Sequence, residues 1–142
     1  MTINSASARY EGLGKKGQGS ISTGSAALVD QPYGFQTRFE DKPGTNPEEL
    51  VGAAHAACFT MATSFALAKA GHADGTLNTN CAVTLEKEGD GFRVAKSALT
   101  LSAWVPGISA EDFQAIAQEA KKNCPLSKLL DCEITLEASL EQ

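Results

Sequence analysis

Alternating apolar and polar positions predict several short strands in the first forty residues. Turn signals in "EGLGKKGQGS", "STGS" and "DQPYG" separate short segments rich in Ser, Thr and aromatic residues between positions 6 and 40. In the last segment, "FQTRFE", the residues at 35, 37 and 39 alternate with more polar ones at 36, 38 and 40. This period of two predicts a strand that carries Arg38 on its polar face.

A long helix is predicted from about residue 46 to residue 70. Asn46 suits the N-cap, Pro47 suits the first helical position, and Glu49 follows three residues after the cap. Gly71 supplies a stop signal. The middle of this segment is apolar on almost every side, which indicates a helix that is buried on several sides.

The same segment is long enough for a membrane span to be considered, since no charged residue occurs from 50 to 68. Gly52, His55 and Thr60 are among the residues that make it only mildly hydrophobic, and no interfacial aromatic belt flanks it. The sequence therefore favours a buried helix of a protein that is not in a membrane.

The rest of the chain carries signals for two strands, a helix and a final strand. It lacks the regular alternation of strand and helix that is typical of a parallel fold. Strands are predicted at 78–88 and 91–105 around a "GDG" turn, a helix at 110–122 behind Ser109, a helical turn from Pro125 and a strand at 132–141. This order predicts an α+β fold with antiparallel sheets, as a single domain over 1–142. A chain of this size leaves a long apolar helix partly uncovered, so we expect a homodimer whose subunits bury it together.

Composition narrows the possible partners and the compartment. The net charge of -5 disfavours nucleic acid and anionic membranes as partners. The N-terminal residues show no apolar region typical of a secretory signal, so we expect a cytoplasmic protein with reduced cysteines. No CxxC motif, finger-like spacing, P-loop or GxGxxG fingerprint is present, so the sequence predicts neither a metal nor a cofactor.

Cys58 lies in the middle of the predicted long helix. A thiol with a pKa near 8.5 is only about 3% thiolate at pH 7, and apolar burial reduces this fraction further. Cys58 is therefore either an inert core residue or a reactive thiol beside a cation, for which Arg38 is the nearest candidate in the sequence.

Cys124 has a different sequence environment, because it follows Lys121 and Lys122 and precedes a helical turn, where unpaired N–H groups favour an anion. Cys81 and Cys132 lie in predicted strands without basic neighbours, which favours buried structural thiols.

His55 and Glu48 each leave two interpretations open. His55, one turn before Cys58, is either a hydrogen-bonded core residue or the base of a cysteine hydrolase. Glu48 either stabilises the helix N-terminus or shares a site with Cys58. Because ten residues of straight helix rise about 15 Å, a shared site requires a bent helix or a second subunit.

The segments "NPEELVGAAHAACF" and "CPLSK" resemble the OsmC/Ohr family of thiol-dependent hydroperoxidases. "FQTRFE" and "LSAWVPG", with the placement of Arg38 and His55, resemble its OsmC branch. The resemblance implies that Cys58 is the peroxidatic cysteine, Cys124 the resolving cysteine, Arg38 the group that stabilises the thiolate and Glu48 the carboxylate that holds Arg38. It also implies an intertwined homodimer with antiparallel sheets around a long central helix.

The implied activity is reduction of organic hydroperoxides, and more weakly of H2O2, through a Cys58 sulfenic acid and a Cys58–Cys124 disulfide. A dithiol or thiol protein restores the pair, and the role is defence against oxidative and osmotic stress. We expect an apolar wall including Phe59, Met61 or Phe39 to favour organic substrates. Two alternatives are a non-catalytic small-molecule-binding protein of the same fold and a hydrolase that uses Cys58 with His55.

Overall fold

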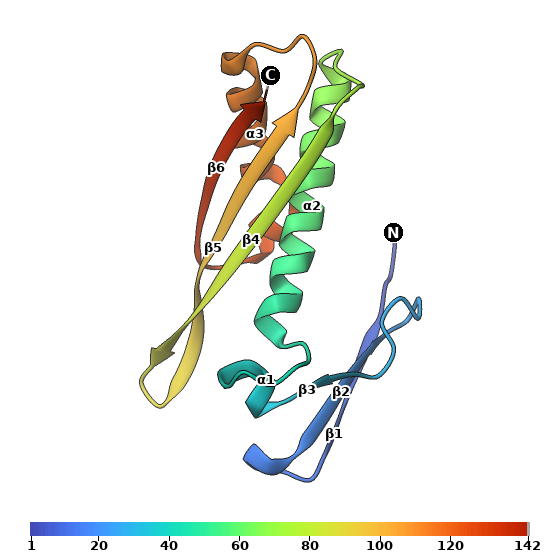
Figure 1. Cartoon of the computed structure of the whole chain (residues 1–142), viewed down its shortest axis with the longest axis vertical. Helices are drawn as coiled ribbons and strands as arrows, with labels where there is room; N and C mark the ends of the chain where they lie inside the picture. The colour runs from blue at the N-terminus through green and yellow to red at the C-terminus, as the bar shows by residue number, and fades with distance from the viewer. Residues whose placement is uncertain (142) are drawn as a thin grey trace. The chain divides into compact units, whose positions relative to one another are not determined.

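The computed structural model describes residues 1–141, and the chain divides into two compact units, Met1–Leu50 and Val51–Gln142. The N-terminal unit holds one small sheet and a short helix, and the C-terminal unit holds a larger sheet and most of the helical residues (Figure 1). The prediction of a single domain over 1–142 remains a prediction. Each unit is described below by itself.

The N-terminal unit contains a three-stranded antiparallel sheet. Strands β1 (Ala6–Glu11), β2 (Gln18–Thr23) and β3 (Gln31–Tyr33) lie in that order, with a 3₁₀ turn, η1 (Gly14–Lys16), between the first two. The predicted short antiparallel strands of this region are therefore confirmed, except for the last.

The segment "FQTRFE" is a helix, α1 (Phe35–Phe39), so its prediction as a strand is wrong. The Thr37 hydroxyl accepts a hydrogen bond from the Gly34 N–H at 2.8 Å and donates one to the Gly34 carbonyl at 3.0 Å. The rings of Phe35 and Phe39 also pack one helical turn apart, with centroids 5.1 Å apart. Because alternation over six residues spans fewer than two helical turns, the pattern did not distinguish a strand from this short helix.

The predicted long helix is confirmed as α2 (Pro47–Lys69). At its start, the Asn46 side chain accepts a hydrogen bond from the Glu49 N–H at 2.8 Å, as an N-cap does. At its end, Gly71 has a φ of +98, and the N–H of the next residue, His72, donates to the Leu67 carbonyl at 2.9 Å. Glycine adopts this left-handed conformation without the steric cost that a Cβ carries, so the helix ends here.

The C-terminal unit contains a three-stranded sheet of mixed direction. Strands β4 (Thr76–Glu88) and β5 (Gly91–Trp104) form the predicted antiparallel hairpin, and β6 (Glu133–Glu141) pairs with β5 in parallel (Figure 1). The expectation of purely antiparallel sheets is wrong at this pair. Helices α3 (Ala110–Asn123) and α4 (Pro125–Leu129) connect β5 to β6 and supply the long crossover that parallel neighbours require.

One hydrophobic core joins α2, α3 and the sheet of this unit. Its fully buried side chains come from all three, namely Phe59, Leu99, Leu101, Phe113, Ala117 and Cys124. The buried residues of α2 recur at spacings of three or four, at positions 52, 55, 59, 63 and 67. Within the single chain, α2 therefore buries one stripe rather than several sides. Met61 and Phe65, on the rest of its surface, are 59% and 69% exposed.

By length and composition, α2 also meets the criteria for a membrane-spanning helix, with a mean hydropathy of 1.5 over its most apolar window. A core helix of a globular protein passes the same test. Gly52 shows such packing, because a Cβ built on it would lie 3.3 Å from the Cys81 carbonyl oxygen in β4. One face of α2 therefore packs on the sheet of this unit.

Candidate active site

The structure brings Cys58 and Cys124 together, although they lie far apart in the sequence. Cys58 lies on α2, Cys124 lies between α3 and α4, and the two thiols are close enough for Cys124 to raise the pKa of Cys58. Cys58 is half-buried, whereas Cys124 is 1% exposed. A small solute therefore reaches Cys58 more readily than Cys124.

The surroundings of Cys58 in its own unit favour the neutral thiol. Burial raises its pKa, the backbone N–H of Leu126 opposes that shift, and the neighbouring Cys124 thiol adds to it. Within the Val51–Gln142 unit, none of the groups acting on this thiol is cationic. A reactive thiolate at Cys58 therefore needs a positive charge from elsewhere.

Cys124 occupies the position that the sequence predicts for it, at the N-cap of α4. Its sulfur accepts a hydrogen bond from the Ser127 N–H at 3.4 Å and lies 3.2 Å from the Ser127 hydroxyl. Lys121, which was expected to make this region basic, donates to the Ile134 carbonyl at 3.4 Å. Ser127, rather than this lysine, therefore contacts the sulfur.

His55 is fully buried, and both of its ring nitrogens face serine hydroxyls. Nδ1 lies 2.6 Å from the Ser97 hydroxyl oxygen, and Nε2 lies 2.8 Å from that of Ser127. Burial lowers the pKa of His55 below its ordinary value, which favours the neutral ring. Since both nitrogens have serine partners, the arrangement does not fit a hydrolase in which His55 activates Cys58.

The sequence interpretation missed Ser97 and Ser127, whose hydroxyls contact the two ring nitrogens of His55. Ser97 shares the buried side of β5 with Leu99 and Leu101. Because buried hydroxyls are normally hydrogen-bonded, a serine in this apolar series is a signal of a buried hydrogen bond. Ser127 belongs to the "CPLSK" segment that carries Cys124.

Cys81 and Cys132 are half-buried, so their prediction as buried thiols is wrong. The Cys81 sulfur lies 3.1 Å from the Ser97 hydroxyl oxygen and 4.0 Å from Nδ1 of His55. Cys132 precedes β6, and burial followed by the charge of Asp131 raises its pKa. Cys81 therefore adjoins the histidine, whereas Cys132 stays in the neutral thiol form.

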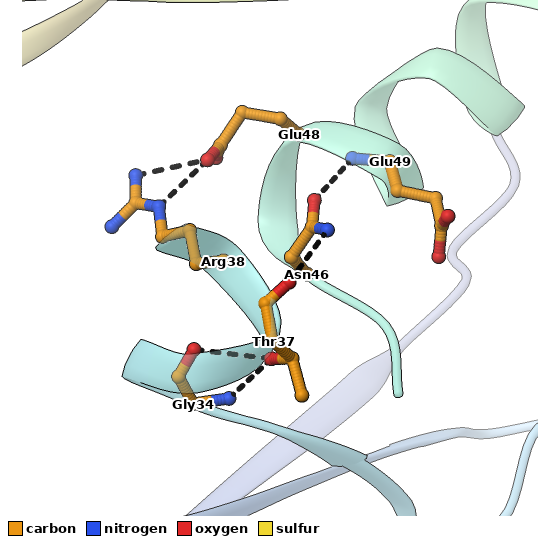
Figure 2. A network of polar contacts seen from close by, with 6 residues as sticks. All are labelled: Gly34, Thr37, Arg38, Asn46, Glu48 and Glu49. Atoms are coloured by element: carbon orange, nitrogen blue, oxygen red, sulfur yellow. Dashed lines mark hydrogen bonds and ion pairs between the residues drawn. The ribbon is translucent and has the colours of Figure 1, made fainter. Parts of the chain in front are cut away.

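Arg38 and Glu48 form a two-pronged ion pair in the N-terminal unit (Figure 2). Nε of Arg38 donates to one carboxylate oxygen of Glu48 at 2.6 Å, and Nη2 donates to the other at 3.2 Å. The guanidinium carbon also lies 5.3 Å from the centre of the Phe39 ring. Glu48 thus restricts the guanidinium to one orientation at the start of α2.

A pocket of about 410 Å³ adjoins this ion pair within the same unit. Four aromatic side chains and two cations line it, and the full set of lining residues is Tyr10, Gly14, Lys15, Tyr33, Gly34, Phe35, Arg38, Phe39 and Pro47. This lining suits an apolar molecule with one polar end. Of the expected wall residues, Phe39 lines this pocket, whereas Phe59 is fully buried in the other unit and is ruled out.

Comparison with known families identifies the chain. The family described as OsmC-like protein matches residues 39–139, which include both Cys58 and Cys124. The chain belongs to the OsmC-like family. "Peroxiredoxin OsmC" of Escherichia coli is 50% identical to this OsmC-like chain over 142 residues, with 99% of each chain covered. This similarity places the chain in the OsmC branch.

More distant relatives agree with this assignment. "Organic hydroperoxide resistance protein OhrA" of Bacillus subtilis is 29% identical over 98 residues, with 67% of each chain covered. An OsmC-like protein of unknown function from Vibrio cholerae has a TM-score of 0.78 at 16% identity, covering 98% of this chain and all of the other. The organic hydroperoxide resistance protein OhrB of Bacillus subtilis has a TM-score of 0.69 at 23% identity, covering 99% and 98%. These structures confirm the α+β OsmC fold.

The predicted site residues of this OsmC-like protein thus form two groups. One is the Cys58–Cys124 thiol pair in the C-terminal unit, and the other is the Arg38–Glu48 ion pair in the N-terminal unit. Among residues 1–141, no group of three or more His, Cys, Asp or Glu side chains could hold a metal ion. The first group offers two thiols, and the second offers a guanidinium held by a carboxylate.

Proposed function

We propose that this OsmC-like protein is a thiol-dependent peroxidase that reduces organic hydroperoxides to alcohols, and H2O2 more weakly. The observation that carries the proposal is the proximity of the half-buried Cys58 to the buried Cys124. The names of the relatives, a peroxiredoxin in Escherichia coli and an organic hydroperoxide resistance protein in Bacillus subtilis, support the same chemistry.

The proposed reaction has three steps. The Cys58 thiolate attacks the outer oxygen of ROOH, the O–O bond breaks, and the alkoxide takes a proton and leaves as ROH. Cys58 is then a sulfenic acid. Cys124 attacks its sulfur, the S–O bond breaks, and water leaves as the Cys58–Cys124 disulfide forms. An external dithiol or thiol protein reduces that disulfide by exchange and becomes oxidised itself.

The Arg38–Glu48 pair supplies the positive charge that the Cys58 thiolate needs in this proposal. Glu48 and Cys58 lie on one continuous helix, α2, and ten residues of helix rise about 15 Å. We therefore propose that the ion pair of a second copy completes each site. The exposed Met61 and Phe65 side chains of α2 support burial of this helix in an intertwined homodimer.

The aromatic pocket beside Arg38 supports an organic substrate. A hydrocarbon tail gains roughly 25 cal/mol for each Å² of apolar surface that it buries, and H2O2 has no such surface. The pocket in the N-terminal unit would hold the tail, while Arg38 faces the peroxide group.

The remaining parts of the proposal follow from composition. The net charge of -5 disfavours nucleic acid and membrane surfaces, so the partners are the hydroperoxide, the thiol reductant and a second copy of the chain. The reduced thiols that the reaction requires fit a cytoplasmic protein without a cofactor. The resemblance to the OsmC/Ohr family implies a role in defence during oxidative and osmotic stress.

The test measures consumption of cumene hydroperoxide with excess dithiothreitol, and follows the oxidised protein by mass spectrometry. Cys58→Ser should abolish consumption, whereas Cys124→Ser should accumulate a sulfenic or sulfinic acid on Cys58. Cys132→Ser is the matched control, because this thiol is half-buried like Cys58 and should be dispensable. A Cys58→Ser protein that still consumes the peroxide at the wild-type rate would contradict the proposal.

A second candidate is a non-catalytic protein that binds a small molecule in the aromatic pocket. The pocket of about 410 Å³ supports this candidate independently of the thiols. It predicts that wild-type protein binds cumyl alcohol, while its thiols react with cumene hydroperoxide no faster than free cysteine does. Rapid oxidation of Cys58 would exclude it.

A further inference from the structure

A continuous chain of polar contacts runs from Cys124 through the interior of the C-terminal unit. The Cys124 sulfur lies 3.2 Å from the Ser127 hydroxyl oxygen, which lies 2.8 Å from Nε2 of His55. On the other side of the ring, Nδ1 lies 2.6 Å from the Ser97 hydroxyl oxygen, and Ser97 lies 3.1 Å from the Cys81 sulfur. The chain thus connects one of the two paired thiols to a buried base.

We propose that His55 is a positioning residue for the resolving thiol, and that it receives, through the Ser127 hydroxyl, the proton that Cys124 loses when the disulfide forms. This inference rests on the proposed peroxidase function. It adds a role for a residue that the three-step reaction does not use.

The two hydrogen-bond directions of the chain show how this transfer works. In the resting enzyme, the Cys124 S–H donates to the Ser127 oxygen, and the Ser127 O–H donates to Nε2 of a neutral His55. When both protons shift along these contacts, Cys124 becomes a thiolate and His55 an imidazolium. The Ser127 hydroxyl and N–H then both donate to the sulfur, and Ser97 accepts from Nδ1.

The proton balance of the resolving step is complete. The Cys124 thiolate forms the S–S bond with Cys58 while the S–O bond of the sulfenic acid breaks. The departing hydroxide takes up one proton, and His55 returns to its neutral form by releasing one. Overall, one thiol and one sulfenic acid give one disulfide and one water, with no further reactant.

The surroundings of His55 suit a temporary proton acceptor. Burial lowers its pKa, which favours the neutral ring, and the Nε2 lone pair then accepts a hydrogen bond from the Ser127 hydroxyl. The titratable groups facing it are the Cys81 thiol from β4 and, through Ser127 of α4, the Cys124 thiol. From β5 it faces only the uncharged Ser97 hydroxyl.

The test separates oxidation of Cys58 from formation of the disulfide. Reduced protein is mixed with one equivalent of cumene hydroperoxide in a stopped-flow instrument, and sulfenic acid and disulfide are counted by mass spectrometry of quenched samples. His55→Gln places an amide nitrogen near the position of Nε2 and can still hydrogen-bond Ser127, but it cannot accept a proton. His55→Asn lacks that reach.

We expect both variants to oxidise Cys58 at the wild-type rate and to form the disulfide more slowly. Without the base, Cys124 must lose its proton to water, and the disulfide step at pH 7 should slow by about 100-fold, the low end of what a positioned general base contributes. The loss should shrink as the pH rises, because hydroxide then takes over the role of the base. Longer-lived sulfenic acid should also give more sulfinic acid at excess peroxide.

Ser127 provides the second, independent pair of variants. Ser127→Ala removes the hydroxyl that links Cys124 to His55 and should reproduce the slow disulfide step, whereas Ser127→Thr keeps a hydroxyl and should stay within a few fold of wild type. Thr63→Val is the control for loss of a buried hydroxyl, because Thr63 lies on the same helix and donates only to the Phe59 carbonyl, at 2.8 Å.

The outcomes are distinguishable. A disulfide step at the wild-type rate in His55→Gln shows that hydrogen bonding alone suffices and overturns the proton transfer. An unchanged disulfide step in Ser127→Ala overturns the relay as well. If wild type oxidises Cys58 but forms no disulfide with Cys124, the proposed two-cysteine function itself fails, and the inference fails with it.

Discussion

Arg38 and Glu48 are joined by two hydrogen bonds, of 2.6 Å and 3.2 Å, across a segment of ten residues. Glu49, the next residue, is engaged elsewhere, because its carboxylate accepts from the Thr45 hydroxyl at 2.9 Å (Figure 2 shows its separate direction). The two neighbouring carboxylates therefore form a natural pair for comparison.

Glu48→Gln should lower the reactivity of Cys58, and Glu49→Gln should not. Without the carboxylate, the guanidinium loses its fixed orientation, and the thiol of Cys58 returns toward the small thiolate fraction of a free cysteine. At pH 7, the rate of alkylation by iodoacetamide in a Cys81→Ser, Cys132→Ser background should fall by about 10- to 30-fold. Equal alkylation rates in the two glutamine variants would contradict a role of the ion pair.

Phe35→Ala should impair reduction of organic hydroperoxides selectively. Phe35 lines the aromatic pocket, and removing a ring that packs on a substrate tail costs about 1.4 kcal/mol or more, or roughly tenfold in kcat/KM. Cumene hydroperoxide should therefore lose about tenfold, and H2O2 less than twofold. Leu13→Ala is the control, because Leu13 is 90% exposed and does not line the pocket. An equal loss with both peroxides would remove the argument for this pocket.

Phe65→Asp should convert a homodimer into a monomer. A carboxylate on the exposed face of α2 would be buried without a partner if a second copy covers this helix, at a cost of several kcal/mol. Light scattering after gel filtration should show wild type at about twice 14.8 kDa and the variant at 14.8 kDa.

Val29→Asp serves as the control for Phe65→Asp, since Val29 is also exposed but lies outside α2. The monomeric variant should also lose its peroxidase activity if a second copy supplies Arg38. A monomeric wild type, or a fully active monomeric variant, would contradict the proposed assembly.

His55 should make the free energy of unfolding depend on pH. Because burial lowers the pKa of His55 in the folded chain, the unfolded chain, with a pKa near 6.5, binds the proton first as the pH falls. The stabilisation by neutral His55 is present above pH 6.5 and is lost as the pH falls through the folded-state value. Between these two values the free energy of unfolding should decrease by up to about 1.4 kcal/mol per pH unit.

Urea unfolding between pH 7.5 and 5 measures this dependence. The difference in unfolding free energy between wild type and His55→Gln should shrink as the pH falls, whereas Thr63→Val should differ from wild type by a constant amount. Parallel pH profiles of wild type and His55→Gln would show that burial of the histidine has no such effect.

The long helix was predictable because its signals are local. The Asn46 cap and Gly71 act within a few residues of the helix ends, and both act in the structure as predicted. The short helix α1 was mistaken for a strand because five residues are too few to separate the two periodicities. The parallel direction of β6 was missed because it depends on where the crossover α3–α4 returns the chain, which no pattern within the strand records.

The candidate site shows the same division between features that local signals predict and features that depend on contacts distant in the sequence. By itself, the sequence placed Cys58 in a helix and Cys124 at a helical turn, because residue type, capping and periodicity are local properties. That Cys58, Cys124, Arg38 and Glu48 carry the chemistry stays a prediction, which rests on the resemblance to the family. Only the tertiary structure decided which thiols meet and that His55 bonds Ser97 and Ser127, which lie 42 and 72 positions away. Such contacts arise when a helix packs on a sheet and the buried polar groups must find partners, and packing acts between segments that the order of residues keeps apart.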